Sequence, residues 1–575
     1  MTKNDFSKLW EQNTENKPPL TFIYNKYLDD INNEDLACFF AEIHNNGKVN
    51  IFKELSNLES YEDKIDTYML IDFINKSSKY IKNSSIADLV STIEKLALKN
   101  NIEYSHLIGI YETIIGQDLE QAILALDYIL KINIDISINL ITPTLYALSR
   151  NSGEICLDRI MNLLTSEKNH IVANTLLALG NIKNIPINEE VSKLILEKSI
   201  GNSNENVLSG LTYTLLKFYI REKDLKLQIL KKLNEIVNLD PSNQIVLHSI
   251  AVELQSNGKE FDIEMIQFLL DKLENVELDS INTLRKIDHI LYNISSQHFA
   301  MVIKFLERIF IQSEHKISIK NFNFFLSYYL LSEENKEDLS FLITRWFLSK
   351  DGFLCRSAGN LILEKEIVIY FDLNQLQENH DNDLYYLARK ACGWYFTNPI
   401  TAISLIFSTL KTCTDQKIIK KIFNLIFNPL LISYPGKVHD YIIEQRKKVD
   451  KKIKKHIDEC LKNLDEYHKN LNEAYKIKEL RPSQLESYTY RKYQQDLMQK
   501  RFEEPNENSL ISSFSTSTLL YGNSSAFLVH TSQGSFRQTV QMQKFSHSVE
   551  FPSMEILDPL TLYNFLIHCR GEALK

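Results

Sequence analysis

The most concentrated chemical feature of the sequence is a basic run between positions 446 and 456. Its cationic residues are Arg446, Lys447, Lys448, Lys451, Lys452, Lys454 and Lys455. On a helix these side chains would spread positive charge over most of the circumference, and phosphate groups are natural partners of such a surface. The sequence leaves two other interpretations open: a solvated helix whose lysines pair with Asp450, Asp458 and Glu459, or a surface for an acidic protein partner. Single-stranded nucleic acid is less favoured, because the run contains no aromatic residue on which a base stacks.

A second mixed segment lies between residues 485 and 502, where Arg491 and Lys492 stand among tyrosines. Cations beside aromatic rings suit nucleic-acid or protein contacts. At helical spacing, the pattern favours a structural role in which Tyr490 and Tyr493 pack on the preceding helix while Arg491 and Lys492 face water. Both cations are kept as candidate contact residues.

Patterns typical of catalysis are missing from the sequence. It has no GxxxxGK[ST] phosphate loop, no HExxH metal motif and no glycine-rich dinucleotide loop, and its seven cysteines are scattered without a CxxC pair. The segment 522–525 (Gly-Asn-Ser-Ser) lacks the second glycine of a nucleophile turn. We therefore expect no catalytic residues, no cofactor and no metal. An enzyme with its site in the C-terminal region remains the second alternative.

The elements that must position the candidate residues are predicted to be repeated helices. Apolar residues of the segment 169–180 recur at three- and four-residue steps, which places them on one helix face: Ile171, Val172, Thr175, Leu176 and Leu179. The same stripe returns roughly 36 residues later, at Val207, Leu211, Thr212, Leu215 and Leu216. A less regular third copy contains Ile245, Ile250 and Leu254. A period of about 35 to 40 residues predicts a stacked helical solenoid.

Two stretches resemble HEAT or armadillo-type repeats. The segment 171–182 resembles an inner HEAT helix with its alanine and leucine face and its closing Leu-Gly pair. In the segment 351–361, Asp351 and Arg356 resemble the turn aspartate and inner-helix arginine of that family, whose members bind partners along an extended repeat surface. The resemblance implies an α-solenoid over residues 131–440 and a role for Arg356 in tying neighbouring repeats together.

The sequence predicts four regions in a mainly α chain. These are an N-terminal helical region or cap (1–130), HEAT-like repeats (131–440), a charged helical hairpin (441–504) and a small β-containing module (505–575). The hairpin is predicted to break at Pro482 and to resume as a helix over 484–502. In the last region, residues 526–530 and 536–542 flank a turn and predict a β-hairpin, a further strand is predicted at 546–551, and a short helix at 560–568.

Composition is that of a folded protein, with 44% hydrophobic and 24% charged residues and a mild net charge of −9. The N-terminus lacks the pattern of a signal peptide, and no apolar run is long enough to span a bilayer, so we expect a cytoplasmic protein without membrane contact. The Asn, Ile and Lys bias suggests a bacterial source.

The leading hypothesis is a non-enzymatic scaffold or adaptor that binds a protein partner. The alternative is a helical-repeat protein that binds nucleic acid through residues 446–456. The oligomeric state stays open.

Overall fold

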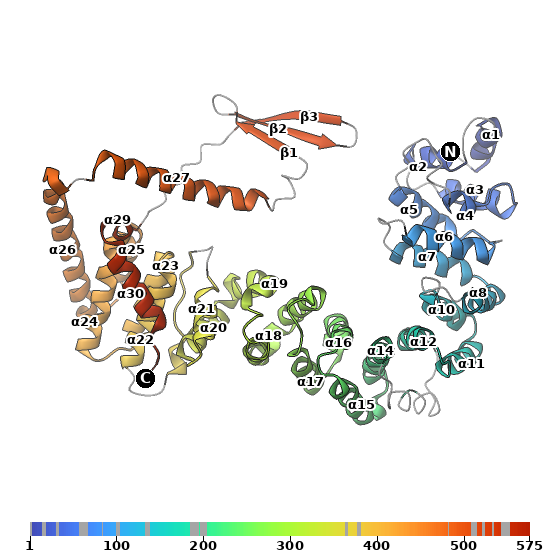
Figure 1. The fold of residues 1–575 in the computed structure, drawn as a ribbon, viewed down its shortest axis with the longest axis horizontal. Helices are drawn as coiled ribbons and strands as arrows, with labels where there is room; N and C mark the ends of the chain where they lie inside the picture. The colour runs from blue at the N-terminus through green and yellow to red at the C-terminus, as the bar shows by residue number, and fades with distance from the viewer. Residues whose placement is uncertain are drawn as a thin grey trace. The chain divides into compact units, whose positions relative to one another are not determined.

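In the computed structural model, helices account for most of the described chain (Figure 1). The structure describes residues 3–13, 19–29, 34–56, 67–82, 84–98, 104–132, 138–184, 195, 204–362, 366–376, 381–480, 482–507, 515–519, 524–531, 534–541 and 552–574. The chain divides into two compact units, Met1–Tyr329 and Leu330–Lys575. The prediction of a mainly α-helical fold is therefore confirmed.

The first unit is a succession of helices. Its α-helices are α1 (Lys3–Asn13), α2 (Pro19–Asp29), α3 (Glu34–Asn45), α4 (Ile51–Ser56), α5 (Thr67–Ser78), α6 (Ile86–Leu98), α7 (Tyr104–Ile115), α8 (Leu119–Ile132), α10 (Ile141–Asn151), α11 (Gly153–Leu164), α12 (Asn169–Asn181), α14 (Glu205–Arg221), α15 (Lys226–Leu239), α16 (Gln244–Asn257), α17 (Ile263–Leu273), α18 (Ile281–Gln312) and α19 (Asn323–Phe325). Short 3₁₀ turns are η2 (Lys223–Leu225), η3 (Gly258–Glu260) and η4 (Ile319–Asn321), and η5 (Leu326–Leu330) is π-helical.

Alternate helices of this unit pack side by side in two rows. One row runs through α3, α5, α7, α10, α12, α14, α16 and α18 (Figure 1). In the other, α4, α6 and α8 contact in sequence, and α17 bonds to α15 through Lys272 Nζ and Asn234 Oδ1 at 2.8 Å. Each helix thus buries its apolar face against the next one of its own row and against a helix of the other row. This succession is compatible with a helical repeat fold.

Helices α12 and α14 pack closely against each other. A Cβ atom added at Gly210 would meet the Ala173 carbonyl oxygen at 3.0 Å, and one added at Gly180 would meet the Tyr213 ring at 3.0 Å. The Thr214 hydroxyl donates to the Leu176 carbonyl at 2.6 Å. Because small residues let the two backbones approach, this hydroxyl reaches a main-chain oxygen of the neighbouring repeat.

The predicted apolar stripes lie in these interfaces. All five residues of the first stripe are buried on α12, and all five of the second are buried on α14. In the third copy Ile250 and Leu254 are buried, but Ile245 is 39% exposed, so its assignment to the core was wrong. Ile245 follows Asn243, which caps α16 by accepting from the Val246 amide at 3.1 Å. In this turn Val246 and Leu247 are buried, so Ile245 lies on the opposite, solvent-facing side of the helix.

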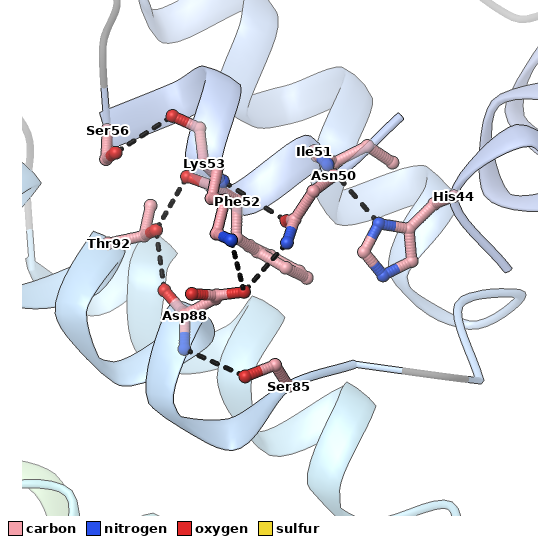
Figure 2. A network of polar contacts seen from close by, with 9 residues as sticks. All are labelled: His44, Asn50, Ile51, Phe52, Lys53, Ser56, Ser85, Asp88 and Thr92. Carbon is pink, nitrogen blue, oxygen red and sulfur yellow. Dashed lines mark hydrogen bonds and ion pairs between the residues drawn. The ribbon is translucent and has the colours of Figure 1, made fainter. Parts of the chain in front are cut away.

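A polar network joins α3, α4 and α6 near the N-terminus (Figure 2). The Asn50 side chain donates to Asp88 Oδ2 at 2.7 Å, and the Thr92 hydroxyl donates to the Phe52 carbonyl at 2.7 Å. The Ile51 amide donates to His44 Nδ1 at 3.3 Å. These hydrogen bonds provide partners for backbone groups at the start of the short helix α4 and hold it between α3 and α6. The role of residues 1–130 as a cap stays a prediction.

The second unit contains further helices and the described strands. The helical elements are η6 (Glu333–Asn335), α20 (Lys336–Leu348), α21 (Gly352–Gly359), η7 (Leu373–Gln375), α22 (Asp381–Tyr395), α23 (Pro399–Leu410), α24 (Gln416–Leu425), η8 (Ile426–Leu431), α25 (Lys437–Arg446), α26 (Lys451–Ala474), η9 (Lys478–Leu480), α27 (Gln484–Glu507), α29 (Met554–Leu557) and α30 (Pro559–Gly571). Asp351 caps α21 by accepting from the Phe353 amide at 2.8 Å. Arg356 is exposed, and its side chain makes no hydrogen bond or ion pair with the described residues, contrary to the tying role that the family resemblance implies.

Three antiparallel strands are described in the order β1 (Ser515–Leu519), β2 (Ser524–Thr531) and β3 (Gly534–Gln541). In their register Ser515 lies opposite Val529, and Val529 lies opposite Phe536. The predicted strand at 546–551 lies outside the described residues. Whether residues 505–575 form a module of their own stays a prediction.

The C-terminal helix α30 packs on α22, far from it in sequence (Figure 1). Leu562, Leu566 and Cys569 are buried in this contact. Buried Lys390 donates to the Arg570 carbonyl at 2.5 Å, and burial lowers its pKa. Arg389 pairs with Glu572 at 3.2 Å. The last helix is therefore part of the core of the second unit, which the prediction of a separable C-terminal region did not anticipate.

Leu176→Asp should destabilise the first unit by about 3–5 kcal/mol, because it buries an unpaired carboxylate where Leu176 is 0% exposed. Leu177→Asp is the matched control, since Leu177 is half-buried one residue further along the same helix. Circular dichroism melts of the two variants should differ clearly. Equal melting temperatures would show that the assigned register of α12 is wrong.

Leu566→Asp should lower the stability of the second unit by about 3 kcal/mol, because the residue is 8% exposed and faces α22. The change Leu560→Asp, on the same helix at 75% exposure, should have little effect. Thermal unfolding followed by circular dichroism measures both. If neither variant lost stability, α30 would be dispensable for the core.

Candidate binding site of the second unit

The basic run lies across the end of α25 and the start of α26. On α26, one face is buried through Ile453, Ile457, Cys460 and Leu464. The Cys460 thiol lies 3.8 Å from the Phe423 carbonyl of α24. Because that stripe is narrow, Lys451, Lys452, Lys454 and Lys455 all remain exposed, and so does Lys447 in the connection that precedes α26.

Most carboxylates near the basic run already accept hydrogen bonds or pair with groups other than the exposed lysines of α26. Arg446 donates to Asp458 at 2.6 Å and lowers the pKa of that carboxyl. Lys448 pairs with Glu444 at 2.5 Å and likewise lowers its pKa. Asp450 caps α26 by accepting from the Ile453 amide at 2.8 Å.

Five lysines of the run are left without an ion pair among the described residues. They are Lys447, Lys451, Lys452, Lys454 and Lys455. The solvated-helix interpretation, in which the lysines pair with Asp450, Asp458 and Glu459, therefore describes Arg446 better than it describes the lysines of α26.

The position of these lysines works against helix stability. The first turn of α26 contains no acidic residue, whereas Lys451, Lys452 and Lys454 stand at the positive end of the helix dipole. Cations there cost about 0.3–1 kcal/mol each, and only the Asp450 cap offsets them. A positive surface that opposes the local fold is more readily explained by an anionic partner than by folding.

A neighbouring helix enlarges this positive surface. Helix α24 contacts α26, contains no acidic residue and exposes Lys417, Lys420 and Lys421. Lys421 Nζ lies 5.6 Å from the ring centre of Tyr385 on α22. These lysines were not predicted as contact residues, because the segment 416–425 contains only three of them. They alternate in this segment with apolar residues that form the buried face of α24. We call the exposed lysines of α24 and of residues 447–455 the basic surface.

An extended segment packs against α23 beside this surface. Residues 366–372 are neither helix nor strand, and their alternate amides donate to hydroxyls of α23. The bonds run from Ile367 to Thr401 at 3.0 Å, from Ile369 to Ser404 at 3.2 Å and from Phe371 to Ser408 at 3.0 Å. Because residues alternate along an extended chain, Ile369 and Phe371 are buried while Tyr370 remains 42% exposed.

Tyr370 forms one wall of a cavity of about 430 Å³. The cavity is lined by Tyr370, Phe407, Leu410, Lys411, Tyr441, Gln445, Lys448, Val449, Asp450 and Ile453. Phe407 and Tyr441 meet edge to face with ring centres 5.8 Å apart, and Lys411 Nζ lies 4.5 Å from the Tyr370 ring centre. The cavity thus combines apolar walls with two cations, directly beside the basic run. No sequence pattern predicts this cavity, because its lining comes from four separate segments.

One lining residue has an unsatisfied polar atom. Tyr441 is 7% exposed, and its hydroxyl forms no hydrogen bond of normal geometry with the described residues, although the Tyr370 side chain is close enough to raise its pKa. Burial raises the pKa of this phenol, and the nearby Tyr370 and Glu444 raise it further. The hydroxyl therefore remains protonated at neutral pH and adds no charge to the cavity.

The second pair of candidate cations lies on α27. Arg491 and Lys492 are exposed, as predicted, but Tyr493 is 60% exposed, so the prediction that it packs on the preceding helix was wrong. Tyr490 is half-buried, and burial raises its pKa. Helix α27 begins two residues after Pro482, near the predicted start, and runs to Glu507, beyond the predicted end at residue 502. The cavity lining includes no residue of α27.

Other site types have no support in the described part of the chain. No group of three or more His, Cys, Asp or Glu residues there has the arrangement of a metal site. No described helix is both long and apolar enough to cross a membrane. Comparison with known protein families, curated proteins and solved structures finds no match for this sequence.

Tyr441→Phe should raise the free energy of unfolding by about 1 kcal/mol, because it removes a buried hydroxyl that forms no hydrogen bond of normal geometry with the described residues. The variant should also lose less stability in alkali. A phenol whose pKa is raised by folding keeps its proton longer than in the unfolded chain, so wild-type stability falls as the pH rises above its ordinary pKa of 10.0. Urea titrations at neutral and alkaline pH measure both effects. A clear loss of stability at neutral pH would mean that the hydroxyl is hydrogen-bonded.

Proposed function

We propose that this chain is a non-catalytic helical scaffold of the HEAT-like type that binds an acidic protein segment on its second unit. The observation that carries the proposal is the basic surface, in which Lys451, Lys452 and Lys454 stand at the start of α26 against the helix dipole and make no ion pair with the described residues. Complementary charge would steer an acidic segment to this surface and would relieve the repulsion there. The first unit, with its repeated interfaces, serves as the rigid support on which further partners dock.

Nucleic acid is the competing ligand for the same surface, and two features favour protein. Carboxylates are interspersed with the lysines, among them Asp440 and Glu459, and would repel a continuous phosphate backbone. The adjoining cavity is walled by Phe407, Leu410 and Ile453, all nearly buried, which suits an apolar side chain better than a stacked base.

An enzyme remains the weaker reading of the fold. The described titratable residues around the cavity are two lysines, two tyrosines and Asp450, and the carboxylate of Asp450 already accepts the Ile453 amide at 2.8 Å. The arrangement offers charge and shape for binding, but no pair of groups that would transfer a proton between them.

Reversing Lys451, Lys452, Lys454 and Lys455 to Glu should abolish binding to a fluorescein-labelled polyglutamate peptide. The same variant should be at least as stable as the wild type, because acidic residues in the first turn favour a helix by about 0.3–1 kcal/mol each. The matched control reverses Lys462, Lys469, Lys476 and Lys478, which changes the net charge equally but lies away from the start of α26.

Fluorescence anisotropy at several salt concentrations, with thermal melts of all three proteins, measures these effects. Wild-type binding should weaken as salt increases, and the control should bind nearly as the wild type does. If the wild type bound single-stranded RNA but not polyglutamate, the nucleic-acid function would replace the scaffold. Equal loss in the control would show that only the overall charge matters.

A further inference from the structure

The cavity beside α26 has the composition of an anchor site rather than of a packing defect. Its walls are contributed by α23, α25, the start of α26 and the segment around Tyr370. Phe407, Leu410 and Ile453 contribute apolar surface to the lining, although each is at most 7% exposed. A volume of about 430 Å³ lies within the range of about 300–1,000 Å³ that is usual for ligand sites.

Charge at the cavity is arranged for an acidic occupant. Lys411 and Lys448 belong to the lining, and both are exposed. Lys447 precedes the lining residue Lys448, Lys451 follows the lining residue Asp450, and both are exposed without an ion pair among the described residues. Asp450 accepts the Ile453 amide at 2.8 Å and Lys448 pairs with Glu444, so Lys411, Lys447 and Lys451 supply the positive charge that no described carboxylate pairs.

We propose that this cavity binds one large apolar side chain of an acidic protein segment, whose flanking carboxylates contact Lys411, Lys448 and the start of α26. The inference rests on the proposed function and deepens it. It adds the residue that the partner must carry: an aromatic or long aliphatic side chain with Asp or Glu on both sides. An apolar anchor in a pocket with charge around its rim is the arrangement that concentrates binding energy in protein interfaces.

The walls explain the preference for an aromatic anchor. The backbone on both sides of Tyr370 is held by the bonds of the Ile369 and Phe371 amides to α23, and Lys411 Nζ lies 4.5 Å from the centre of the Tyr370 ring. The ring of Tyr441 is fixed by its edge-to-face contact with Phe407. Rigid aromatic walls favour a flat ring between them, because little side-chain freedom is lost on binding.

The test uses the full-length chain and two labelled peptides. Both are short runs of Glu and Asp, and they differ at one central residue, which is Phe in one and Ala in the other. The wild type should bind the Phe peptide about tenfold or more tightly, because the Phe side chain becomes buried. Fluorescence anisotropy at fixed salt measures the two affinities.

Val449→Trp fills the cavity and should abolish the preference for Phe over Ala. Ile443→Trp is the matched control, because Ile443 is 36% exposed on α25 and does not line the cavity. It should keep the preference. Tyr370→Ala, which removes an exposed wall, should also reduce the preference and provides the same test if Val449→Trp does not fold.

The outcomes separate the two proposals. Equal affinity of the wild type for both peptides would overturn the anchor site but leave the acidic-partner function standing. A Phe preference that survives both Val449→Trp and Tyr370→Ala would place the anchor elsewhere and would also overturn the inference. Failure of the wild type to bind either peptide would overturn the proposed function together with the anchor site.

Discussion

The close approach of successive helices is the constraint on which the first unit depends. Where α12 meets α14, Gly180 and Gly210 leave no room for a side chain, so the neighbouring backbones come within reach of a Thr214 hydroxyl. Similar side-chain bonds join residues of consecutive repeats elsewhere, such as Ser209 with Ser249 at 2.6 Å. Apolar burial drives the stacking, but it is non-directional. These bonds between repeats give each helix a fixed partner and register.

In the second unit, two helices that are far apart in the sequence pack together. Helix α30 contacts α22 and is held by the bond from Lys390 to the Arg570 carbonyl and the pair of Arg389 with Glu572. The position of Gly393 adds to this contact, because a Cβ there would lie 2.9 Å from the Cys569 Cβ. The packing of α30 thus stabilises the second unit through contacts that local sequence patterns do not predict.

At the start of α26, the residues that would favour helix stability differ from those that would favour binding of an anionic partner. The buried stripe of this helix would fold equally well with glutamates in the first turn, and the helix dipole would favour them. Lysines stand there instead, beside a cavity whose walls are already fixed by the packing of α23 and α25. Local disagreement between sequence and fold is typical of functional sites, since binding and folding make separate demands on the same residues.

The sequence by itself determined the helices of the repeats and the charge of the basic run. The stripes on α12 and α14 are readable because a helix brings every third or fourth residue to one face, so local spacing alone identifies buried positions such as Leu176 and Leu211. The lysines of α26 are exposed for the same local reason. The sequence does not identify the partner of these lysines, because positive charge attracts phosphate and carboxylate alike.

Only the tertiary structure decided what lies beside these lysines. The cavity joins Tyr370, Phe407, Tyr441 and Ile453, which come from four segments and share no pattern in the sequence. The exposure of Ile245 and Tyr493 and the docking of α30 on α22 depend likewise on distant neighbours. Periodicity describes one helix at a time, whereas a cavity and a closing contact exist only between elements, where packing of separate segments determines which faces meet.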